Sequence, residues 1–340
     1  MNLMDRKKKM FYFLSFLAVL GLLFGCSEAG DESETAVSDS TNLEGETLTL
    51  PRLTAVNLEG RPLQVVASTS LIGDVVAQVG EGAIDLTTLM GTGQDPHSYE
   101  PGAQELTAVA KADIIFINGW GLEEALVQVL ETISGDVPVV PISANIEPLL
   151  LNDEDSDHEP GGADPHVWLD IQNVRQWTEN AVQVLTALDP ANATTYRSNA
   201  DTYLAKLDIL EKDVKDQLAT IPTENRVLVT NHDSFGYFAK AYGFEILGTV
   251  LPGSSTFAEP SARDLRNLIE TMETHGVCTI FTETAVNDNL AQTIASELAN
   301  CDTVQAIPLY TGAIGPTGRG ADNYIGMFQA NVAAIVAGLN

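Results

Sequence analysis

The chain has 340 residues, 44% of them hydrophobic, and its 47 acidic against 17 basic side chains give a net charge of −30. This length exceeds that of a usual single domain, so we expect two lobes, each with a core of its own. The strong negative charge repels phosphate backbones and acidic lipid surfaces and attracts cations, so we exclude nucleic acid as a partner.

The N-terminus has the features of an export signal. Arg6-Lys7-Lys8-Lys9 precedes an apolar run from Met10 to Phe24, which is shorter than the about 20 residues of a membrane span. The sequence Leu23-Phe24-Gly25-Cys26 resembles a bacterial lipobox, although Phe24 departs from the usual small or aliphatic residue. We expect residues 1–26 to be the signal peptide and Cys26 to carry lipid; the alternative is a plain secretory signal with an incidental cysteine. The protein would then be anchored at the outer face of the cytoplasmic membrane, at a cell surface or in a periplasm.

Residues 27–60 contain eight acids, one base and few large apolar side chains, which predicts an acidic disordered tether. With Cys26 assigned to lipid, Cys278 and Cys301 remain as a pair in an oxidising compartment. They form either a disulfide or two buried thiols.

From Leu63 onward, short β-branched runs alternate with amphipathic stretches, which is typical of parallel sheets covered by helices. The first series predicts strands at Gln64–Ser68, Leu86–Met90, Asp113–Asn118 and Val137–Ile142, with helices that include Ile72–Val79 and Leu122–Thr132. The second predicts strands at Val227–Thr230, Glu245–Val250, Val277–Thr282 and Val304–Pro308, with helices near Phe235–Tyr242, Ala262–His275, Asn289–Ala299 and Tyr324–Leu339.

A long helix is predicted between the two series. Apolar residues recur at spacings of three and four from Asn192 to Leu218, before Pro222 ends the helix. We therefore expect an α/β protein with an N-terminal lobe at 61–191, a linking helix at 192–221 and a C-terminal lobe at 222–340. The lobes would face each other over a cleft, with the carboxyl ends of their strands, where ligands bind in such sheets, pointing into it.

Three of the five histidines stand where a predicted strand has just ended. They are His97 in GQDPHSYEP, His166 in ADPHVWLD and His232 in TNHDSF, so the tripeptide Asp-Pro-His occurs twice. Proline fixes φ and stiffens the approach to each histidine, which lowers the ordering cost of binding. A single histidine of this kind is most simply a hydrogen-bonded core residue, but three at equivalent strand ends favour a metal site.

The donor set favours zinc. Neutral imidazole is a borderline-soft ligand, and three imidazoles with one carboxylate suit four-coordinate Zn²⁺, whereas Mn²⁺ prefers more oxygen. We therefore expect Zn²⁺ as the bound ion, with Mn²⁺ or Fe²⁺ as alternatives.

Four segments resemble those of the zinc- and manganese-binding proteins of ABC importers, called the cluster A-I or metal-binding lipoprotein family. They are DPHSYEP, DPHVWLD, NHDSFGYFAKAYG and GADNYIGMFQANV, and the resemblance runs in order from about Leu63 to Asn340. It implies two α/β lobes joined by one long helix, with metal between the lobes. It also implies that His97 and His166 are ligands from the N-terminal lobe and His232 the first from the C-terminal lobe. Manganese-selective relatives often have Glu at the last position, so His232 favours zinc.

The resemblance leaves the fourth ligand open. Many relatives place an Asp in the turn that here reads YTGA at 310–313, where Gly312 has no side chain to offer. Some zinc-binding relatives use a Glu at the end of the preceding strand, and Glu283 matches that position. We predict Glu283 as the fourth metal ligand, with a bound water or Asp322 as alternatives. The other possible role of Glu283 is to support a ligand or cap a helix.

The function that the resemblance implies is binding and delivery of a metal, not catalysis. The partners would be an ABC permease and its ATPase, and we expect a monomer.

The acidic stretch NDEDSDHE at 152–159 corresponds to a His- and acid-rich loop of zinc-handling relatives; it either gathers cations weakly or is a solvated loop. One alternative is a secreted zinc hydrolase, although the chain has no H-E-x-x-H motif. The other is a metal-buffering or adhesin lipoprotein without a transporter.

Overall fold

The fold is taken from a computed structural model that describes residues 46–133, 135, 137–151, 162–301 and 303–340. The predicted signal peptide with Cys26, the first part of the tether and the acidic stretch at 152–159 lie outside these residues. Within the described ranges, no helix is both long and apolar enough to cross a membrane.

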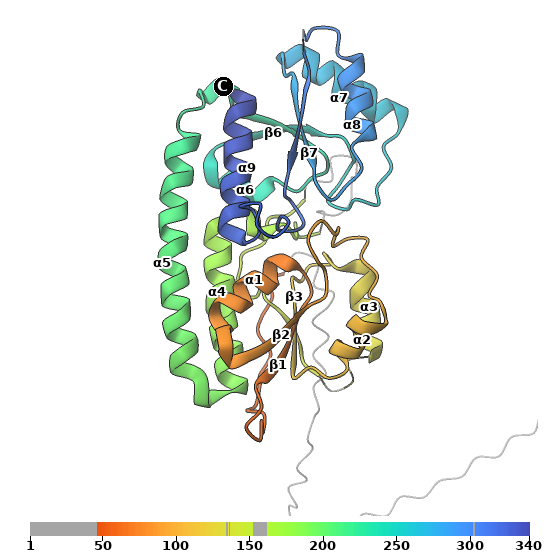
Figure 1. Ribbon diagram of the computed structural model, residues 1–340. Helices are drawn as coiled ribbons and strands as arrows, with labels where there is room; N and C mark the ends of the chain where they lie inside the picture. Colours follow the sequence, from red (N-terminus) through yellow and green to blue (C-terminus); the bar gives the residue numbers. More distant parts are fainter. Residues whose placement is uncertain (1–45, 134, 136, 152–161, 302) are drawn as a thin grey trace, which may run out of the picture. The chain divides into compact units, whose positions relative to one another are not determined.

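The first half of the body, here called the N-lobe, is built on a parallel four-stranded sheet (Figure 1). Its strands are β1 (Leu63–Ala67), β2 (Ile84–Thr88), β3 (Ile114–Ile117) and β4 (Val139–Pro141), in the order β2-β1-β3-β4. β2 begins and ends earlier than predicted, because Leu89 and Met90 are buried beyond the end of the strand. Their backbone N–H groups still donate to Ala67 O and Ser68 O (both 2.9 Å), so the pairing with the β1 segment continues just past the assigned strand.

Helices cover both faces of the N-lobe sheet (Figure 1). α1 (Ser70–Gly80) and α4 (Ile171–Leu188) lie on one face, and α2 (Ala103–Val109) and α3 (Glu124–Ile133) on the other. Alternate strand residues point to opposite faces, so Val65 packs with α1 and α4 while Val66 packs with α2 and α3. α2 and α4 are additional to the helices expected from the sequence.

The second half, here called the C-lobe, repeats this design. Its parallel strands are β5 (Val227–Thr230), β6 (Glu245–Thr249), β7 (Thr279–Glu283) and β8 (Gln305–Leu309), in the order β6-β5-β7-β8. α6 (Gly236–Tyr242) and α9 (Tyr324–Leu339) cover one face, and α7 (Ala262–His275) and α8 (Asn289–Glu297) the other (Figure 1). Short 3₁₀ helices lie at Glu81–Ala83 (η1), Val167–Leu169 (η2), Pro190–Asn192 (η3) and Thr223–Asn225 (η4).

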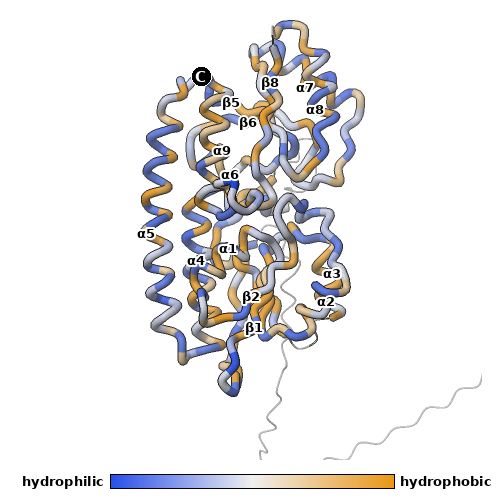
Figure 2. The backbone as a smooth tube through the Cα atoms, viewed as in Figure 1, coloured by the Kyte–Doolittle hydropathy of each residue, from blue (hydrophilic) through white to orange (hydrophobic). Residues whose placement is uncertain are grey.

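The 26-residue helix α5 (Ala193–Leu218) connects the two lobes in the chain and packs against α1, α4 and α9 (Figure 1). Hydrophobic and hydrophilic residues alternate along it (Figure 2). Its buried stripe is the one that the sequence pattern indicates: Tyr196, Ala200, Tyr203, Leu207, Leu210, Val214 and Leu218. The fold class, two parallel α/β lobes with one long helix, is confirmed. The predicted domain boundaries at 61–191, 192–221 and 222–340 stay a prediction.

Residues 46–60 correct one prediction. They form neither helix nor strand, but they are not the end of a disordered tether, because Leu48 is buried and other apolar residues of the stretch pack against the core. The backbone is also held: Asn145 N donates to Leu48 O (2.8 Å) and Val56 N donates to Leu188 O (2.8 Å). The composition of the stretch did not predict this packing, because the residues that its few apolar side chains contact lie far along the chain. The prediction of a tether remains one for residues 27–45.

Of the two possibilities for the cysteines, the structure contains the disulfide. Cys278 and Cys301 are bonded to each other. The bond joins the residue before β7 to the segment between α8 and β8.

Candidate metal centre

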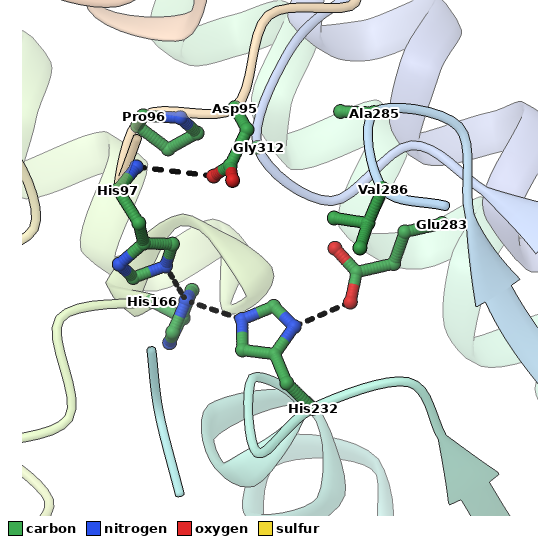
Figure 3. A pocket seen from close by; sticks show the side chains of 9 residues that line it. All are labelled: Asp95, Pro96, His97, His166, His232, Glu283, Ala285, Val286 and Gly312. Carbon is green, nitrogen blue, oxygen red and sulfur yellow. Dashed lines mark hydrogen bonds and ion pairs between the residues drawn. The ribbon is translucent and has the colours of Figure 1, made fainter. Parts of the chain in front are cut away.

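His97, His166 and His232 meet between the two lobes, although they are far apart in sequence (Figure 3). The Nε2 atom of His166 lies 3.2 Å from Nε2 of His97 and 3.1 Å from Nε2 of His232. All three side chains are buried, with 3%, 2% and 2% of their surface exposed. The structure therefore brings together the histidines that the sequence singled out.

Local structure explains how the two N-lobe histidines are presented. In both Asp-Pro-His tripeptides the aspartate accepts a hydrogen bond from the backbone N–H of the histidine: Asp95 Oδ1 from His97 (3.0 Å) and Asp164 Oδ1 from His166 (2.9 Å). Aspartate side chains commonly bond the backbone two residues on. The aspartate, and not only the proline, therefore fixes the approach to each imidazole.

Carboxylates also orient two of the three imidazole rings. His166 Nδ1 lies 2.8 Å from Asp164 Oδ1, and His232 Nδ1 is hydrogen-bonded to Glu283 Oε1 (Figure 3). A carboxylate at Nδ1 holds a proton there and leaves the lone pair of the ring on Nε2. His97 differs, because its buried Nδ1 has no hydrogen-bond partner among the residues that the structure describes.

These contacts leave a position for a cation among the rings. If His166 and His232 both carry a proton on Nδ1, their Nε2 lone pairs face each other at 3.1 Å and repel, unless a second proton on His232 or a metal ion lies between them. A tetrahedral zinc ion with Zn–N bonds of about 2.0–2.1 Å would separate its nitrogen ligands by about 3.3 Å. The two separations from His166 are close to that spacing, and the ligand atoms of all three histidines lie within 4.8 Å of one another, so the three nitrogens could share one metal ion.

The protonation states suit metal binding at neutral pH. Burial, and then the charge of the neighbouring imidazoles, lowers the pKa of His97 to about 3 and that of His166 well below its usual value. Burial also opposes charge on His232, but the charge and hydrogen bond of Glu283 raise its pKa above the ordinary value. His232 in turn lowers the pKa of Glu283 despite burial. Two imidazoles are thus neutral and ready to bind, and the third shares a proton with a carboxylate.

The space at the centre of the site is very small. It measures about 10 Å³, enough for a single ion or water molecule. Its walls are Asp95, Pro96, His97, His166, His232, Glu283, Ala285, Val286 and Gly312 (Figure 3). At Gly312 an added Cβ would lie 2.6 Å from Cδ of Pro96, so the absence of a side chain allows the two loops to approach.

The predicted fourth ligands occupy different places. Glu283 is the last residue of β7 and lines the space, but its oxygens are engaged by His232 Nδ1 and by the hydroxyl of Thr311. Its role as a direct ligand stays a prediction. The carboxylate of Asp322 accepts from the backbone N–H of Gly318 (2.8 Å) and does not line the space.

Sequence reasoning missed three contributors. Asp95 and Asp164 were visible as the first residue of the repeated tripeptide, and that repetition was the signal. Thr311 gave no signal: its hydroxyl donates to Glu283, and its carbonyl accepts from Trp168 Nε1 of the N-lobe (2.7 Å). This turn of the C-lobe therefore links the carboxylate on His232 to the segment that follows His166.

Comparison with known proteins gives a consistent result. Residues 65–338 match the model of the family described as zinc-uptake complex component A, periplasmic. The manganese-binding lipoprotein MntA of Halalkalibacterium halodurans is 34% identical over 287 residues, which cover 84% of this chain and 92% of that protein. The zinc-binding protein TroA of Treponema pallidum is 33% identical over 286 residues, which cover 83% of this chain and 90% of that protein.

Solved structures share the fold. The structure of the periplasmic zinc-binding protein TroA from Treponema pallidum superposes with a TM-score of 0.75 at 33% identity, covering 82% of this chain and 99% of that one. The manganese-bound periplasmic metal-binding protein from Candidatus Liberibacter asiaticus gives a TM-score of 0.71 at 27% identity, covering 81% and 99%.

Proposed function

The chain belongs to the family of the periplasmic zinc-uptake complex component A, and on this premise we propose that it captures zinc outside the cytoplasmic membrane and delivers it to an ABC permease and its ATPase. Its relatives are named as a manganese-binding lipoprotein, a zinc-binding protein and, in several cases, substrate-binding lipoproteins of manganese or metal ABC transporters. Metal binding for a transporter is therefore the general function, and the choice of zinc is the proposal.

The convergence of three buried Nε2 atoms carries the proposal. We infer that His97, His166 and His232 bind the ion directly, since their Nε2 atoms lie together and two of the rings have a carboxylate at Nδ1. Such carboxylate–imidazole pairs raise the basicity of the ring and fix its orientation towards a metal. Because the three ligands come from both lobes, a small relative movement of the lobes would release the ion.

The donor set supports zinc over manganese. Names of relatives do not decide between the two metals, because they include both. Three imidazoles suit Zn²⁺ in a tetrahedral site, while Mn²⁺ favours oxygen ligands, of which this centre offers few. Fe²⁺ is a further candidate, because imidazole also suits it.

A water molecule is the ligand that the contacts best support for the fourth position. Both oxygens of Glu283 are already engaged, and the central space has room for one small ligand or ion. Glu283 would then act through His232 and not on the metal itself. Direct ligation by Glu283 would require one of its oxygens to bind the ion through its remaining lone pair while it still accepts a hydrogen bond, or to leave His232 or Thr311.

A zinc hydrolase is disfavoured by the size of the site. Catalytic zinc needs an open position that a substrate can reach, but the space beside the histidines measures about 10 Å³. An ester or peptide would not enter it without a large opening of the lobes. Binding without chemistry is the simpler function for such an enclosed centre.

We further propose that Cys26 carries lipid and that the protein works as a monomer at the outer face of the membrane. Relatives named as lipoproteins support the anchor. Labelling of expressing cells with a fatty-acid analogue would test it, and a Cys26→Ala variant that is still labelled would contradict it.

Metal titration tests the main proposal. We expect the chain from Ser27 onward to bind one Zn²⁺ and to prefer Zn²⁺ to Mn²⁺ and Fe²⁺ in competition with a chelator. His275→Ala is a matched control, because His275 is exposed and its Nδ1 contacts only Thr271 O of the same helix among the described residues. Failure to bind any of these ions would contradict the proposal. So would wild-type affinity in a His97→Ala, His166→Ala double variant.

A further inference from the structure

We propose that Thr256 is a positioning residue that couples closure of the two lobes to the placement of His97. The inference deepens the proposed metal-binding function and rests on it. It follows from one hydrogen bond between the lobes and from the unequal support of the three histidines.

One carboxylate connects the two lobes and the backbone of a histidine. Thr256, in the loop between β6 and α7, donates from its hydroxyl to Asp95 Oδ2 (2.6 Å). The same carboxylate accepts from His97 N–H (3.0 Å) through Oδ1 and from the Ser98 hydroxyl (3.0 Å) through Oδ2. The loop that contains His97 is thus held by hydrogen bonds within the loop and by one hydrogen bond to the C-lobe.

Several other hydrogen bonds also join the lobes. Near the metal centre, Trp168 Nε1 donates to Thr311 O (2.7 Å) and the Tyr237 hydroxyl donates to Asp164 O (3.0 Å). Another group lies beside the linking helix. Tyr324 N donates to Asp74 (2.9 Å), and the Tyr324 hydroxyl donates to Trp168 O (2.7 Å). These residues belong to α1, α9 and η2; α1 and α9 pack directly against α5. The loop of Thr256 leads instead to α7, on the side of the C-lobe away from α5 (Figure 1). When two lobes rotate about a linking helix, contacts far from that helix separate most, so the Thr256–Asp95 bond is sensitive to opening.

His97 is the histidine that needs such support. His166 and His232 each have a carboxylate on Nδ1, which fixes the ring. Within the described part of the chain, nothing bonds Nδ1 of His97, so no carboxylate orients its ring, which contacts the other two imidazoles through its far side. Its backbone N–H is held by Asp95, whose other oxygen is held by Thr256. Loss of the Thr256 bond on opening would therefore loosen His97 before the other two ligands.

Release kinetics of the Zn²⁺-loaded chain from Ser27 onward test the inference. Thr256→Val replaces the hydroxyl by a methyl group of similar size, and Thr256→Ser keeps the hydroxyl. We expect Thr256→Val to release Zn²⁺ to an excess of chelator about tenfold faster than the wild type. A tenfold change corresponds to the loss of one hydrogen bond to a carboxylate. The association rate of Zn²⁺ should stay unchanged. Thr256→Ser should restore the wild-type rate. Ser255→Ala is the matched control, because the Ser255 hydroxyl contacts Phe257 N of its own loop (3.4 Å).

Hydrogen exchange separates positioning from simple loss of stability. In Zn²⁺-loaded Thr256→Val, the His97 amide should exchange faster, while the His166 amide keeps its protection. Wild-type release from Thr256→Val would overturn the inference, and so would a Thr256→Ser variant that releases as fast as Thr256→Val. If metal-free Thr256→Val unfolds at a lower temperature than the wild type, the rates of Zn²⁺ release from Thr256→Ala and Thr256→Ser are compared instead. Absence of Zn²⁺ and Mn²⁺ binding in the wild type would instead refute the proposed function.

Discussion

The two Asp-Pro-His tripeptides have the same sequence and the same backbone hydrogen bond, but their aspartates hold different things. Asp164 is buried and bonds both the N–H and the Nδ1 of its own histidine, His166. Asp95 bonds the N–H of His97 but turns its other oxygen to Ser98 and to Thr256 of the opposite lobe. The carboxylate of one copy therefore orients an imidazole, and the carboxylate of the other connects the two lobes; the backbone carbonyl of Asp164 also accepts from Tyr237 of the C-lobe (3.0 Å). A short motif fixes the local backbone, and its surroundings decide what the remaining oxygen does.

The largest expected effects come from removing an imidazole from either tripeptide. His166→Ala and His97→Ala should each weaken Zn²⁺ binding by roughly 100-fold or more, since each removes one of few ligands of a strongly held ion. His166 should be the more damaging, because its Nε2 lies between those of His97 and His232. Chelator competition measures both affinities. A loss of Zn²⁺ affinity in His166→Ala that is equal to or smaller than that in His97→Ala would contradict the position of His166 between the other two ligands.

The next largest effects on Zn²⁺ affinity are expected from the two aspartates, and they should differ in size. Asp164→Asn removes the charge that supports Nδ1 of His166, and we expect a loss of about 100-fold in Zn²⁺ affinity. Asp95→Asn does not touch an imidazole nitrogen, but it weakens the bonds to His97 N–H and Thr256, so it should cost about tenfold, as Thr256→Val does. Isothermal titration with Zn²⁺ measures the two variants side by side. If they lose the same affinity, the distinction between the two tripeptides fails.

The pH dependence should report the protonation of His232, the second ring that a carboxylate supports. The pKa of His232 is raised by Glu283 in the metal-free protein, so zinc must displace a proton from it. Affinity should be flat above that raised pKa and fall by about tenfold per pH unit below it, because one proton competes with one ion. Glu283→Gln removes the charge that raises the pKa, so the fall should begin at lower pH. An unshifted profile in Glu283→Gln would contradict this assignment.

The smallest effects are expected from the prolines. Pro96→Ala and Pro165→Ala should lower the stability of the metal-free protein by about 0.4–1 kcal/mol, mainly because the unfolded chain gains freedom. Zinc affinity should change by less than about fivefold, since the aspartate bonds remain. Urea unfolding and chelator competition measure the two quantities. A Pro165→Ala variant as weak as Asp164→Asn would show that proline, and not aspartate, fixes the histidine.

Much of the fold was predictable because local pattern and burial coincide in it. The strands of both sheets and the stripe of α5 follow apolar periodicity, which reflects how one face of each element is buried. Residues 46–60 were not predictable in this way. Their polar composition is typical of disorder, yet Leu48 packs beside Gly119, where an added Cβ would lie 2.4 Å from it. Burial of such isolated residues depends on partners that only the folded chain supplies.

By itself, the sequence determined which imidazoles are available, His97, His166 and His232, because a repeated tripeptide and a strand end are local features. The expectation that all three directly follow a strand was wrong: only His232 does, while His97 lies in the loop between β2 and α2 and His166 immediately precedes η2. Only the tertiary structure decided how those rings are supported: Asp164 on His166, Glu283 on His232 and no carboxylate of the described chain on Nδ1 of His97. It also decided that Asp95 meets Thr256 across the lobes. Such pairings join residues far apart in the chain. Their distances depend on how the two lobes pack, which local sequence pattern does not predict.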